Sequence, residues 1–348
     1  MVPSQFARGA SLTSRLFLLV CLCLAASFLH AAPEKPKVSI AVGGKAGLFY
    51  LPLTLAERLG YFKDEGLEVQ IVDFAGGSKA LQAMMGGSAD VVAGGFDHVI
   101  ILRARGQKLK AFVLMDATPS LALGVSKERA ATYKSPRDLK GMKVGVTAPG
   151  SSTNIFVNYL LANAGLSPDD VSIIGVGSGP AAIAAMRAGQ VDAIANVEPV
   201  ITMLERSGTI KVVAETMSEQ GSRAVFGNLL PSGSLYTKDE FIQRYPETTR
   251  ALANAIVRAL KWLSTASDED VLKIVPPEYL LGDRDTYLAA LSRQRRGVSR
   301  DGVIPPAGAQ ALYQVLKRFD PAVKEAGPLD VRQAYEVKFA ESAAAVTR

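Results

Sequence analysis

Two short runs of glycine and hydroxyl residues could bind an anion. They are GGS at residues 76–78 and GSST at residues 150–153. Each run precedes a stretch with helical character, which places its backbone N–H groups and hydroxyls at a helix N-terminus. That end of a helix is positively polarised and favours carboxylate, sulfonate or phosphate groups. A simple turn or helix cap is the alternative for each run. The expected contacts are Gly77, Ser78, Ser151, Ser152 and Thr153.

Further candidate contacts lie in other loops that follow expected strands. Phe49 and Tyr50, in GGKAGLFY, could form an aromatic wall against a ligand, with core packing as the alternative. Asp97 and Glu198 end matched loops, and a carboxylate facing the cleft would suit a ligand with an amine or polar N–H group. A local turn bond is the alternative for Asp97. The remaining candidates are Asn196, in the same segment as Glu198, and Arg223, at an expected crossing between lobes.

The first 32 residues have the features of a secretory signal peptide. Arg8 and Arg15 precede the apolar run LFLLVCLCLAASFL, and the small residues Ala31 and Ala32 follow it. The run is short for a membrane span, and the polar stretch PEKPK comes next. We therefore expect a cleaved signal and a periplasmic protein rather than a permanent membrane anchor.

Removal of this segment leaves few groups for covalent or metal chemistry. Both cysteines and one of the two histidines lie within it, so His98 is the only histidine expected in the mature protein. Disulfides, thiolate catalysis and cysteine zinc sites are excluded on this basis, and neither a metal site nor a cofactor is expected.

The charge pattern does not indicate a nucleic-acid-binding protein. The net charge of +6 is spread along the chain, whereas nucleic-acid binding would need a concentrated basic stripe. The densest basic group consists of Arg293, Arg295 and Arg296, and we expect it on a solvated helix face.

A repeated sequence indicates two similar lobes. Residues 76–95, GGSKALQAMMGGSADVVAGG, align without a gap with residues 178–197, SGPAAIAAMRAGQVDAIANV. Each copy covers one expected helix and one expected strand within a longer alternation of strands and helices. That alternation predicts an α/β fold of two lobes, each a mainly parallel sheet flanked by helices, with a helical C-terminal segment.

The order of these elements predicts the domain boundaries. Lobe 1 is expected at residues 33–127 and 222–348, and lobe 2 at residues 128–221. Crossings near residues 121–127 and 215–226 would then act as a hinge. Ligands of open α/β sheets bind outside the carboxyl ends of the strands, so the candidate residues should face one another across a cleft between the lobes.

The C-terminal part is expected to contain helices only, from Ser234 onward. Thr237 and Glu240 have the spacing of a capping box for the first of these helices. A later helix, starting near Pro246, has an apolar stripe that should face the core. The stripe consists of Leu252, Ile256, Leu260 and Leu263.

Five stretches, in this order, resemble a known family. They are LTLAERLGYFKDEGLEVQIV, GGSKALQAMMGGSADVVAGG, SPRDLKGMKVGVTAPGSST, LLANAGLSPDDV and AAMRAGQVDAIANVEP, within residues 37–205. The family is that of the periplasmic substrate-binding proteins of ABC importers for nitrate, sulfonates, taurine and thiamine-precursor pyrimidines. The resemblance implies a two-lobed periplasmic-binding-protein fold of the type II kind, a ligand enclosed between the lobes and delivery to a membrane permease. The ligand contacts that it implies are Phe49, Tyr50, Ser78, Asp97, Ser152, Thr153 and Glu198.

The function expected from these features is that of a non-enzymatic, monomeric receptor. It would capture a small anionic or zwitterionic solute, such as a sulfonate, taurine, nitrate or a pyrimidine-like compound, by hinge closure. Two alternatives stay open. An enzyme of the same fold would act on a small heterocycle or ester, and turnover of a bound ligand would reveal it. A sensory module would dock on a membrane kinase, and the neighbouring genes would distinguish it from a transport receptor.

Overall fold

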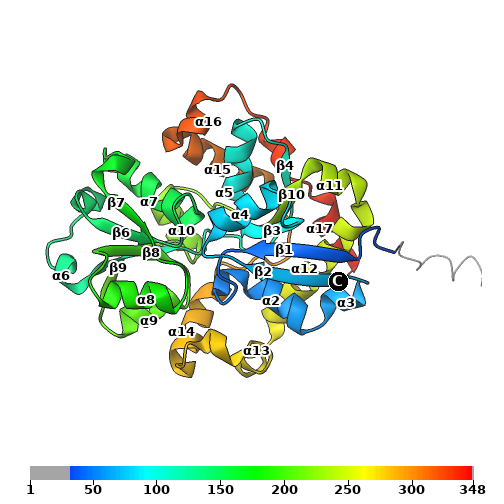
Figure 1. Ribbon diagram of the computed structural model, residues 1–348, viewed down its shortest axis with the longest axis horizontal. Helices are drawn as coiled ribbons and strands as arrows, with labels where there is room; N and C mark the ends of the chain where they lie inside the picture. The colour runs from blue at the N-terminus through cyan, green and yellow to red at the C-terminus, as the bar shows by residue number, and fades with distance from the viewer. Residues whose placement is uncertain (1–31, 347–348) are drawn as a thin grey trace, which may run out of the picture. The chain divides into compact units, whose positions relative to one another are not determined.

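Two five-stranded sheets, each with helices packed on it, form the framework of the protein (Figure 1). The computed structural model describes residues 32–346, so the predicted signal peptide lies, up to residue 31, outside the described residues. We call each sheet with its helices a lobe. The α/β class predicted from the sequence is confirmed: four strands of each sheet run in one direction, and one antiparallel strand lies between two of them.

The first sheet has the strand order β2-β1-β3-β10-β4. Strands β1, β2 and β3 are parallel, whereas β10 runs antiparallel between β3 and β4. The strands are β1 (Lys37–Val42), β2 (Glu68–Asp73), β3 (Val91–Gly95), β4 (Leu109–Leu114) and β10 (Gly233–Lys238). Its early helices are α2 (Leu51–Arg58), α3 (Tyr61–Asp64), α4 (Gly77–Met85) and α5 (Phe96–Ala104).

The second sheet repeats this arrangement with the order β7-β6-β8-β5-β9. Here β5 is the antiparallel strand, between β8 and β9. The strands are β5 (Ala122–Ser126), β6 (Lys143–Val146), β7 (Ser172–Gly175), β8 (Ala193–Asn196) and β9 (Ile210–Glu215). The helices are α6 (Lys127–Ala130), α7 (Ser152–Asn163), α8 (Pro180–Arg187), α9 (Val200–Arg206) and α10 (Glu219–Phe226).

The sequence repeat corresponds to the same helix and strand in both lobes. Its first copy forms α4 and β3, and its second copy forms α8 and β8. The repeated aspartates have matching structural roles. Asp90 accepts a hydrogen bond from the backbone N–H of Ser39 in β1 at 2.9 Å, and Asp192 accepts one from Lys143 in β6 at 2.9 Å. Both acids therefore anchor the start of the neighbouring parallel strand.

The C-terminal segment packs mainly on the first lobe and also reaches the second. The stripe predicted for α12 is confirmed, since Leu252, Ile256, Leu260 and Leu263 are all buried. Helix α14 packs on α9, and α15 packs on both α5 and α7. The helices are α11 (Asp239–Arg244), α12 (Pro246–Thr265), α13 (Asp268–Ile274), α14 (Arg284–Arg295), α15 (Pro306–Phe319), α16 (Pro321–Glu325) and α17 (Lys338–Val346).

The prediction of helices only after Ser234 is wrong, because β10 occupies residues 233–238. This strand is buried between β3 and β4, so its sequence GSLYTK lacks the alternation of a half-exposed strand. The predicted capping box is also wrong. Thr237 lies in the strand and donates its hydroxyl to the carbonyl of Asp90 at 2.6 Å, while Lys238 is the N-cap of α11.

The chain passes between the sheets through residues 115–121 and 227–232. The two connections are joined where Ser232 N–H donates to the carbonyl of Asp116 at 3.0 Å. They lie a few residues from the crossings expected near 121–127 and 215–226, because β5 pairs within the second sheet and α10 packs on β9. The boundaries predicted at 127/128 and 221/222 separate the two parts that would move relative to each other. Since the structure shows one arrangement of the lobes, these boundaries stay a prediction.

Asp116 lies fully buried in the first connection. One carboxyl oxygen accepts a hydrogen bond from Gln294 Nε2 at 2.7 Å, whereas Oδ2 has no partner among residues 32–346. Burial raises the pKa of Asp116 well above its usual range, and the bond from Gln294 offsets only part of this. The folded protein therefore favours the protonated, neutral carboxyl.

Replacement of Asp116 by Asn should stabilise the protein at pH 7. Because the folded-state pKa is raised, the stability that the native carboxyl contributes is full below the unfolded pKa and is lost as pH rises through the folded pKa. Asn carries no charge, so Asp116→Asn should raise the free energy of unfolding at pH 7, by a margin that grows as pH rises.

Urea unfolding between pH 4 and pH 8 measures this effect. The advantage of Asp116→Asn should grow with pH, while Asp169→Asn, on an exposed side chain, should leave the pH profile unchanged. A native protein that is more stable than Asp116→Asn at pH 7 would contradict the prediction.

Candidate functional site

The N-termini of α4 and α7, one from each lobe, meet between the two sheets. Ser78, in the first turn of α4, donates its backbone N–H to Ser151 Oγ at 3.1 Å. Ser151, the N-cap of α7, donates its hydroxyl to Ser78 Oγ at 3.2 Å, and Ser78 Oγ donates to the carbonyl of Pro149 at 2.8 Å. The two helix openings predicted to bind an anion are therefore hydrogen-bonded to each other.

Three further contacts join the lobes around this point. Ser152 Oγ donates to Asp97 Oδ1 at 2.9 Å, and Ser178 Oγ donates to the carbonyl of Gly43 at 3.3 Å. The backbone N–H of Leu48 donates to the carbonyl of Glu198 at 2.8 Å. These contacts place loops that follow β1, β3 and β8 against the other lobe, as the rule for ligand sites in α/β sheets predicts.

A cavity lies where these loops meet, with a space of about 350 Å³ including its mouth. None of its lining residues is charged, and several present hydroxyl groups. The lining residues are Gly43, Phe49, Tyr50, Gly77, Gly95, Leu121, Thr147, Ser151, Ser152, Thr153 and Val197.

The first turn of α7 offers hydrogen-bond donors to this cavity. Within residues 32–346, the backbone N–H groups of Ser152 and Thr153 have no acceptor, as is normal for the first positions of a helix. Thr153 Oγ1 accepts from the backbone N–H of Thr147 at 3.0 Å, which fixes the side chain against the end of β6. The free N–H groups and the helix dipole together favour an anion here.

Tyr50 adds a neutral hydroxyl to the wall. Its Oη accepts a hydrogen bond from the backbone N–H of Gly43 at 3.3 Å, and its ring packs edge-on against Phe49 with the centroids 5.1 Å apart. Burial raises the pKa of Tyr50 well above its usual value, and the bond from Gly43 opposes this only in part. The phenol therefore keeps its proton and can donate it to a ligand oxygen.

The structure brings most of the predicted contact residues to the cavity. Phe49, Tyr50, Gly77, Ser151, Ser152 and Thr153 line it. Ser78 is buried beside it in the bonds between the lobes. Asp97 is bound to Ser152 and lines an adjoining chamber. Whether these residues contact a solute stays a prediction.

Glu198 does not line the cavity. Its side chain is fully buried and accepts hydrogen bonds from the backbone N–H and the hydroxyl of Thr202 at 2.9 and 2.8 Å. Arg293 Nε lies 3.3 Å from Glu198 Oε1. Burial raises the pKa of Glu198, and the charge of Arg293 opposes the rise. With its oxygens occupied in this way, Glu198 is not placed to receive a ligand amine from the cavity.

Two other candidates also lie away from the cavity. Asn196 is buried, donates to the carbonyl of Gly177 at 2.9 Å and accepts from the backbone N–H of Val197, so it holds two loops together. Arg223 is exposed on α10. Arg293 was expected on a solvated helix face, and this expectation is wrong. Its side chain is only 19% exposed and pairs with Glu198 and Glu205.

Five lining residues were not predicted. Thr147 and Val197 directly follow β6 and β8, so the rule that places ligands at the carboxyl ends of strands could have found them. Gly43 begins the segment GGKAGLFY, and Gly95 belongs to the first copy of the repeat. Leu121 comes from the connection between the sheets, and no sequence pattern marks it.

A model of the NMT1-like family matches residues 31–275, well over half of the chain. The chain belongs to the NMT1-like family. A solved structure of a Bordetella bronchiseptica RB50 protein is 49% identical, with a TM-score of 0.88 over 91% of this chain and 99% of that one.

More distant relatives of this NMT1-like protein differ in their stated functions. The alkanesulfonate-binding protein SsuA from Xanthomonas axonopodis pv. citri, solved with MOPS bound, is 20% identical over 87% of this chain and 98% of its own, with a TM-score of 0.67. This likeness shows the two-lobed periplasmic-binding-protein fold. YtlA of Bacillus subtilis, named as a binding protein, is 22% identical over 72% of this chain and 73% of its own. A 4-amino-5-hydroxymethyl-2-methylpyrimidine phosphate synthase of Saccharomyces cerevisiae is 22% identical over 65% of this chain and 67% of its own.

Two glycines of the NMT1-like chain permit the close approach of the lobes. A Cβ on Gly76 would lie 2.7 Å from Ala148 Cβ, and a Cβ on Gly95 would clash with Ser152 Oγ of the second lobe and with Asp97 Oδ1 of its own lobe. Both residues have φ values that any amino acid adopts. Glycine is therefore needed at these positions because it lacks a side chain, and not because of its backbone conformation. Glycine at these positions lets the first lobe touch the second.

Replacement of Gly76 by Ala should shift the protein toward an open arrangement of the lobes. The three atoms nearest to the added methyl group all belong to the second lobe, and such overpacking typically costs about 1–3 kcal/mol. We expect a longer distance between fluorophores attached to cysteines introduced at Lys63 and Lys134, which are exposed residues of different lobes.

Gly179→Ala provides the matched control. Gly179 is the N-cap of α8 as Gly76 is the N-cap of α4, but a Cβ there meets no atom within 4 Å. The control should keep the native distance. Equal distances in Gly76→Ala and the native protein would show that this contact does not determine the arrangement of the lobes.

Proposed function

We propose that this protein is a solute-binding receptor of an ABC importer. It captures a small anionic or zwitterionic solute between its two lobes and delivers it to a membrane permease. Sulfonates, taurine, nitrate and pyrimidine-like compounds are the candidate solutes. The SsuA-type fold and the NMT1-like family membership support this function, and the geometry of the cleft suggests the charge of the solute.

The observation that carries the proposal is the meeting of two helix N-termini, from α4 and α7, at one uncharged cavity. Each terminus carries a partial positive charge, so an anion placed between them is attracted by both. Both attractions operate together only when the lobes are closed. A solute that binds the closed form more tightly shifts the population toward it, which is the condition for capture by hinge closure.

The helix N-termini favour an anionic head group, and an acid in the adjoining wall would suit an ammonium group beside it. Asp97 is the nearest acid in the adjoining wall, and its Oδ1 already accepts from Ser152 Oγ and from the backbone N–H of His98. The ammonium group of a zwitterion such as taurine would be directed toward Asp97, while its sulfonate would occupy the helix N-termini.

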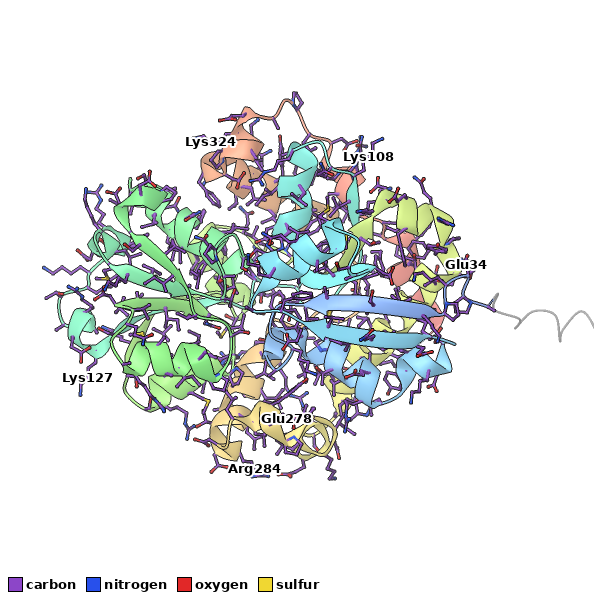
Figure 2. The ribbon with its side chains drawn as sticks, in the orientation of Figure 1. Glu34, Lys108, Lys127, Glu278, Arg284 and Lys324 are labelled. Atoms are coloured by element: carbon purple, nitrogen blue, oxygen red, sulfur yellow. The ribbon has the colours of Figure 1, made fainter. Side chains whose placement is uncertain are left out.

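The remaining surface suits a freely diffusing receptor. Charged side chains such as Lys108, Lys127 and Arg284 are exposed at separate places (Figure 2). No helix within the described residues is long and apolar enough to span a membrane. We infer export to the periplasm by the segment of residues 1–32, and action as a monomer without a nucleic-acid partner.

The synthase relatives define the enzymatic alternative. We infer that this chain is not an enzyme, because the cavity is lined by backbone, hydroxyl and apolar groups. His98, the single histidine after residue 32, has its Nδ1 3.1 Å from Tyr236 Oη and does not line the cavity. Within residues 32–346, no group of three His, Cys, Asp or Glu side chains could hold a metal ion.

A thermal-unfolding panel tests the proposed function. The purified protein is heated with methanesulfonate, taurine, nitrate, acetate and an aminopyrimidine in turn, and each sample is then analysed for new products. A true ligand at about 100 times its dissociation constant should stabilise the fold by about 2.7 kcal/mol and be recovered unchanged.

Ser152→Ala identifies the site in the same assay. It removes a hydroxyl that would turn from Asp97 to a bound anion, and the binding of the active solute should weaken by roughly tenfold, as for a lost hydrogen bond to a charged group. Ser172→Ala, on an exposed strand residue, should bind normally. A new product in the panel would contradict the receptor function. Equal binding by the two variants would contradict the site.

A further inference from the structure

A segment of the C-terminal part, residues 281–299, crosses from the first lobe to the second beside the connections between the sheets. It contains α14, which lies against α9 of the second lobe (Figure 1). Its first residue, Leu281, packs on an apolar cluster of that lobe. Its last residues run along the first connection, where the backbone N–H of Ala117 donates to the carbonyl of Gly297 at 2.7 Å. We call residues 281–299 the strap.

Three consecutive residues of the strap hold three different parts of the protein. Arg293 binds α9 of the second lobe, and Gln294 donates to Asp116 of the first connection. Arg295 donates to two carbonyls at the end of α12, a helix that packs on α2 and β4 of the first lobe. Because the strap is attached to both lobes and to a connection between them, the lobes cannot move apart without changing its contacts.

Arg293 makes its bonds through two nitrogens of the guanidinium group. Nη1 donates to Glu205 Oε2 at 2.6 Å and to Thr202 Oγ1 at 3.2 Å. Nε lies 3.3 Å from Glu198 Oε1. Thr202 and Glu205 belong to α9, and Glu198 lies just before this helix. A planar cation that binds several acceptors at once fixes their direction as well as their distance.

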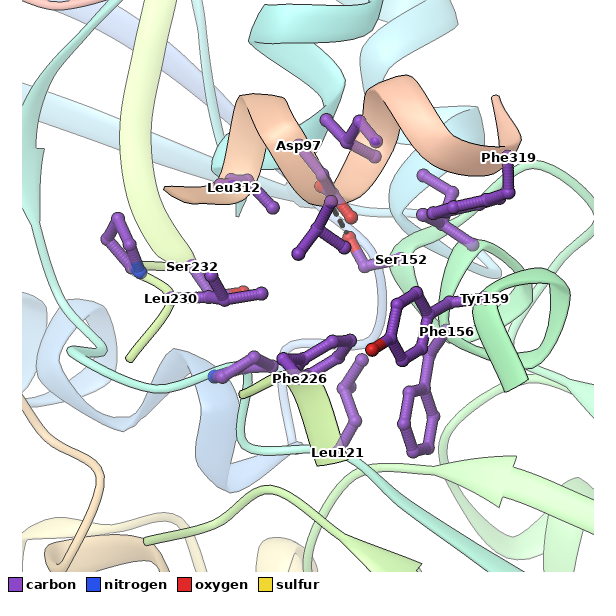
Figure 3. Close-up of a pocket in the computed structure, with 15 residues that line it drawn as sticks. Asp97, Leu121, Ser152, Phe156, Tyr159, Phe226, Leu230, Ser232, Leu312 and Phe319 are labelled. Carbon is purple, nitrogen blue, oxygen red and sulfur yellow. Dashed lines mark hydrogen bonds between the residues drawn. The ribbon is translucent and has the colours of Figure 1, made fainter. Parts of the chain in front are cut away.

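The other helix that reaches the second lobe makes apolar contacts instead. Figure 3 shows Leu312 and Phe319 of α15 on one side of an apolar pocket, with Tyr159 and Phe226 of the second lobe on the other. The ring centroids of Tyr159 and Phe319 are 5.9 Å apart. Apolar attraction has no preferred direction, so α15 can cover the second lobe in more than one arrangement. Of these two helices, α14 in the strap is therefore the one that can specify a single arrangement.

Glu198 connects the strap to the polar cavity. Its side chain pairs with Arg293, while its backbone carbonyl accepts the N–H of Leu48, from the first lobe, at 2.8 Å. Its neighbour Val197 lines the cavity, and so do the two residues that follow Leu48. The position of Glu198 therefore affects cavity walls that come from both lobes.

The charge of Arg293 stabilises Glu198 in this position. Burial raises the pKa of Glu198, the charge of Arg293 on α14 opposes this rise, and the charge of Glu205 on α9 adds to it. A buried carboxylate that has lost its cation is strongly destabilised, so it must take up a proton or move toward water. Movement toward water would draw the carbonyl of Glu198 away from Leu48 and separate the lobes.

From these contacts we propose that Arg293 is a positioning residue for the cleft. Through Glu198 it keeps the loop after β8 against the first lobe, and the strap thereby specifies the arrangement in which the lobes touch. The inference goes beyond the proposed function, since it concerns how the chain holds its two lobes whether or not a solute is bound.

The distance between the lobes, measured without solute, tests this proposal. Fluorophores are attached to cysteines at Lys63 and Lys134, and Arg293→Gln is compared with the native protein at pH 8 and pH 5. At pH 8 the ratio of open to closed molecules should rise by about tenfold or more, as for a lost hydrogen bond to a charged group. Loss of Arg293 raises the pKa of Glu198 further, so at pH 5 this side chain should be neutral and the native distance should return.

Two controls accompany this variant. The double variant Arg293→Gln/Glu198→Gln leaves no buried charge, so it should keep the native distance at both pH values. Arg296→Gln removes a neighbouring positive charge from an exposed side chain and should keep it too. If circular dichroism shows that Arg293→Gln does not fold, Arg293→Lys replaces it. A single nitrogen cannot hold Glu198 and Glu205 together as the guanidinium does, so this variant should also lengthen the distance at pH 8.

The outcomes separate positioning from a merely structural role. A native distance at pH 8 in folded Arg293→Gln, or in the lysine variant where it is used instead, would overturn the proposal. A distance that stays long at pH 5 or in the double variant would also overturn it, because Arg293 would then act on the lobes by a route other than Glu198. Neither result depends on the solute panel, so the receptor function is tested separately.

Discussion

Like partial charges face each other where α4 meets α7, and the arrangement of the lobes depends on how that repulsion is relieved. Each helix N-terminus carries roughly half a positive charge. In the structure, the hydroxyl oxygens of Ser78 and Ser151 lie between the two termini and accept part of the available hydrogen bonds. The N–H groups of Ser152 and Thr153 stay without an acceptor in the described part of the chain. An anion between the termini would satisfy these groups and replace repulsion by attraction, which links closure to binding.

The rest of the fold brings these two termini together. Each sheet contains an antiparallel strand that lies next to a connection between the lobes, β5 in the second sheet and β10 in the first. Helices α14 and α15 extend from the first lobe to the second, and the buried pair of Glu198 and Arg293 fixes α14 to the start of α9. These contacts restrict the ways in which the lobes can move apart.

The sequence predicted the fold and the helix openings because their signals are local. Periodic apolar residues, glycines and hydroxyl residues before helices, and the repeat with Asp90 and Asp192 all depend on neighbours a few residues away. β10 was missed because its strand character comes from burial between two strands far away in the chain. The buried position of Glu198 could not be seen for a related reason, since its partner Arg293 lies on a helix almost a hundred residues later. Leu121 lies in the connection between the sheets, and no local pattern marks it as part of the cavity wall.

The most direct test of this account is an anomalous-scattering map of a crystal of the protein soaked in sodium selenate. Selenate is a compact tetrahedral oxyanion whose selenium atom can be located without reference to a model. The account predicts a peak between the N-termini of α4 and α7, within hydrogen-bond distance of the N–H groups of Ser152 and Thr153. Selenium bound only elsewhere on the surface, with the cavity free of it at saturating concentration, would contradict the claim that the two helix N-termini form an anion site.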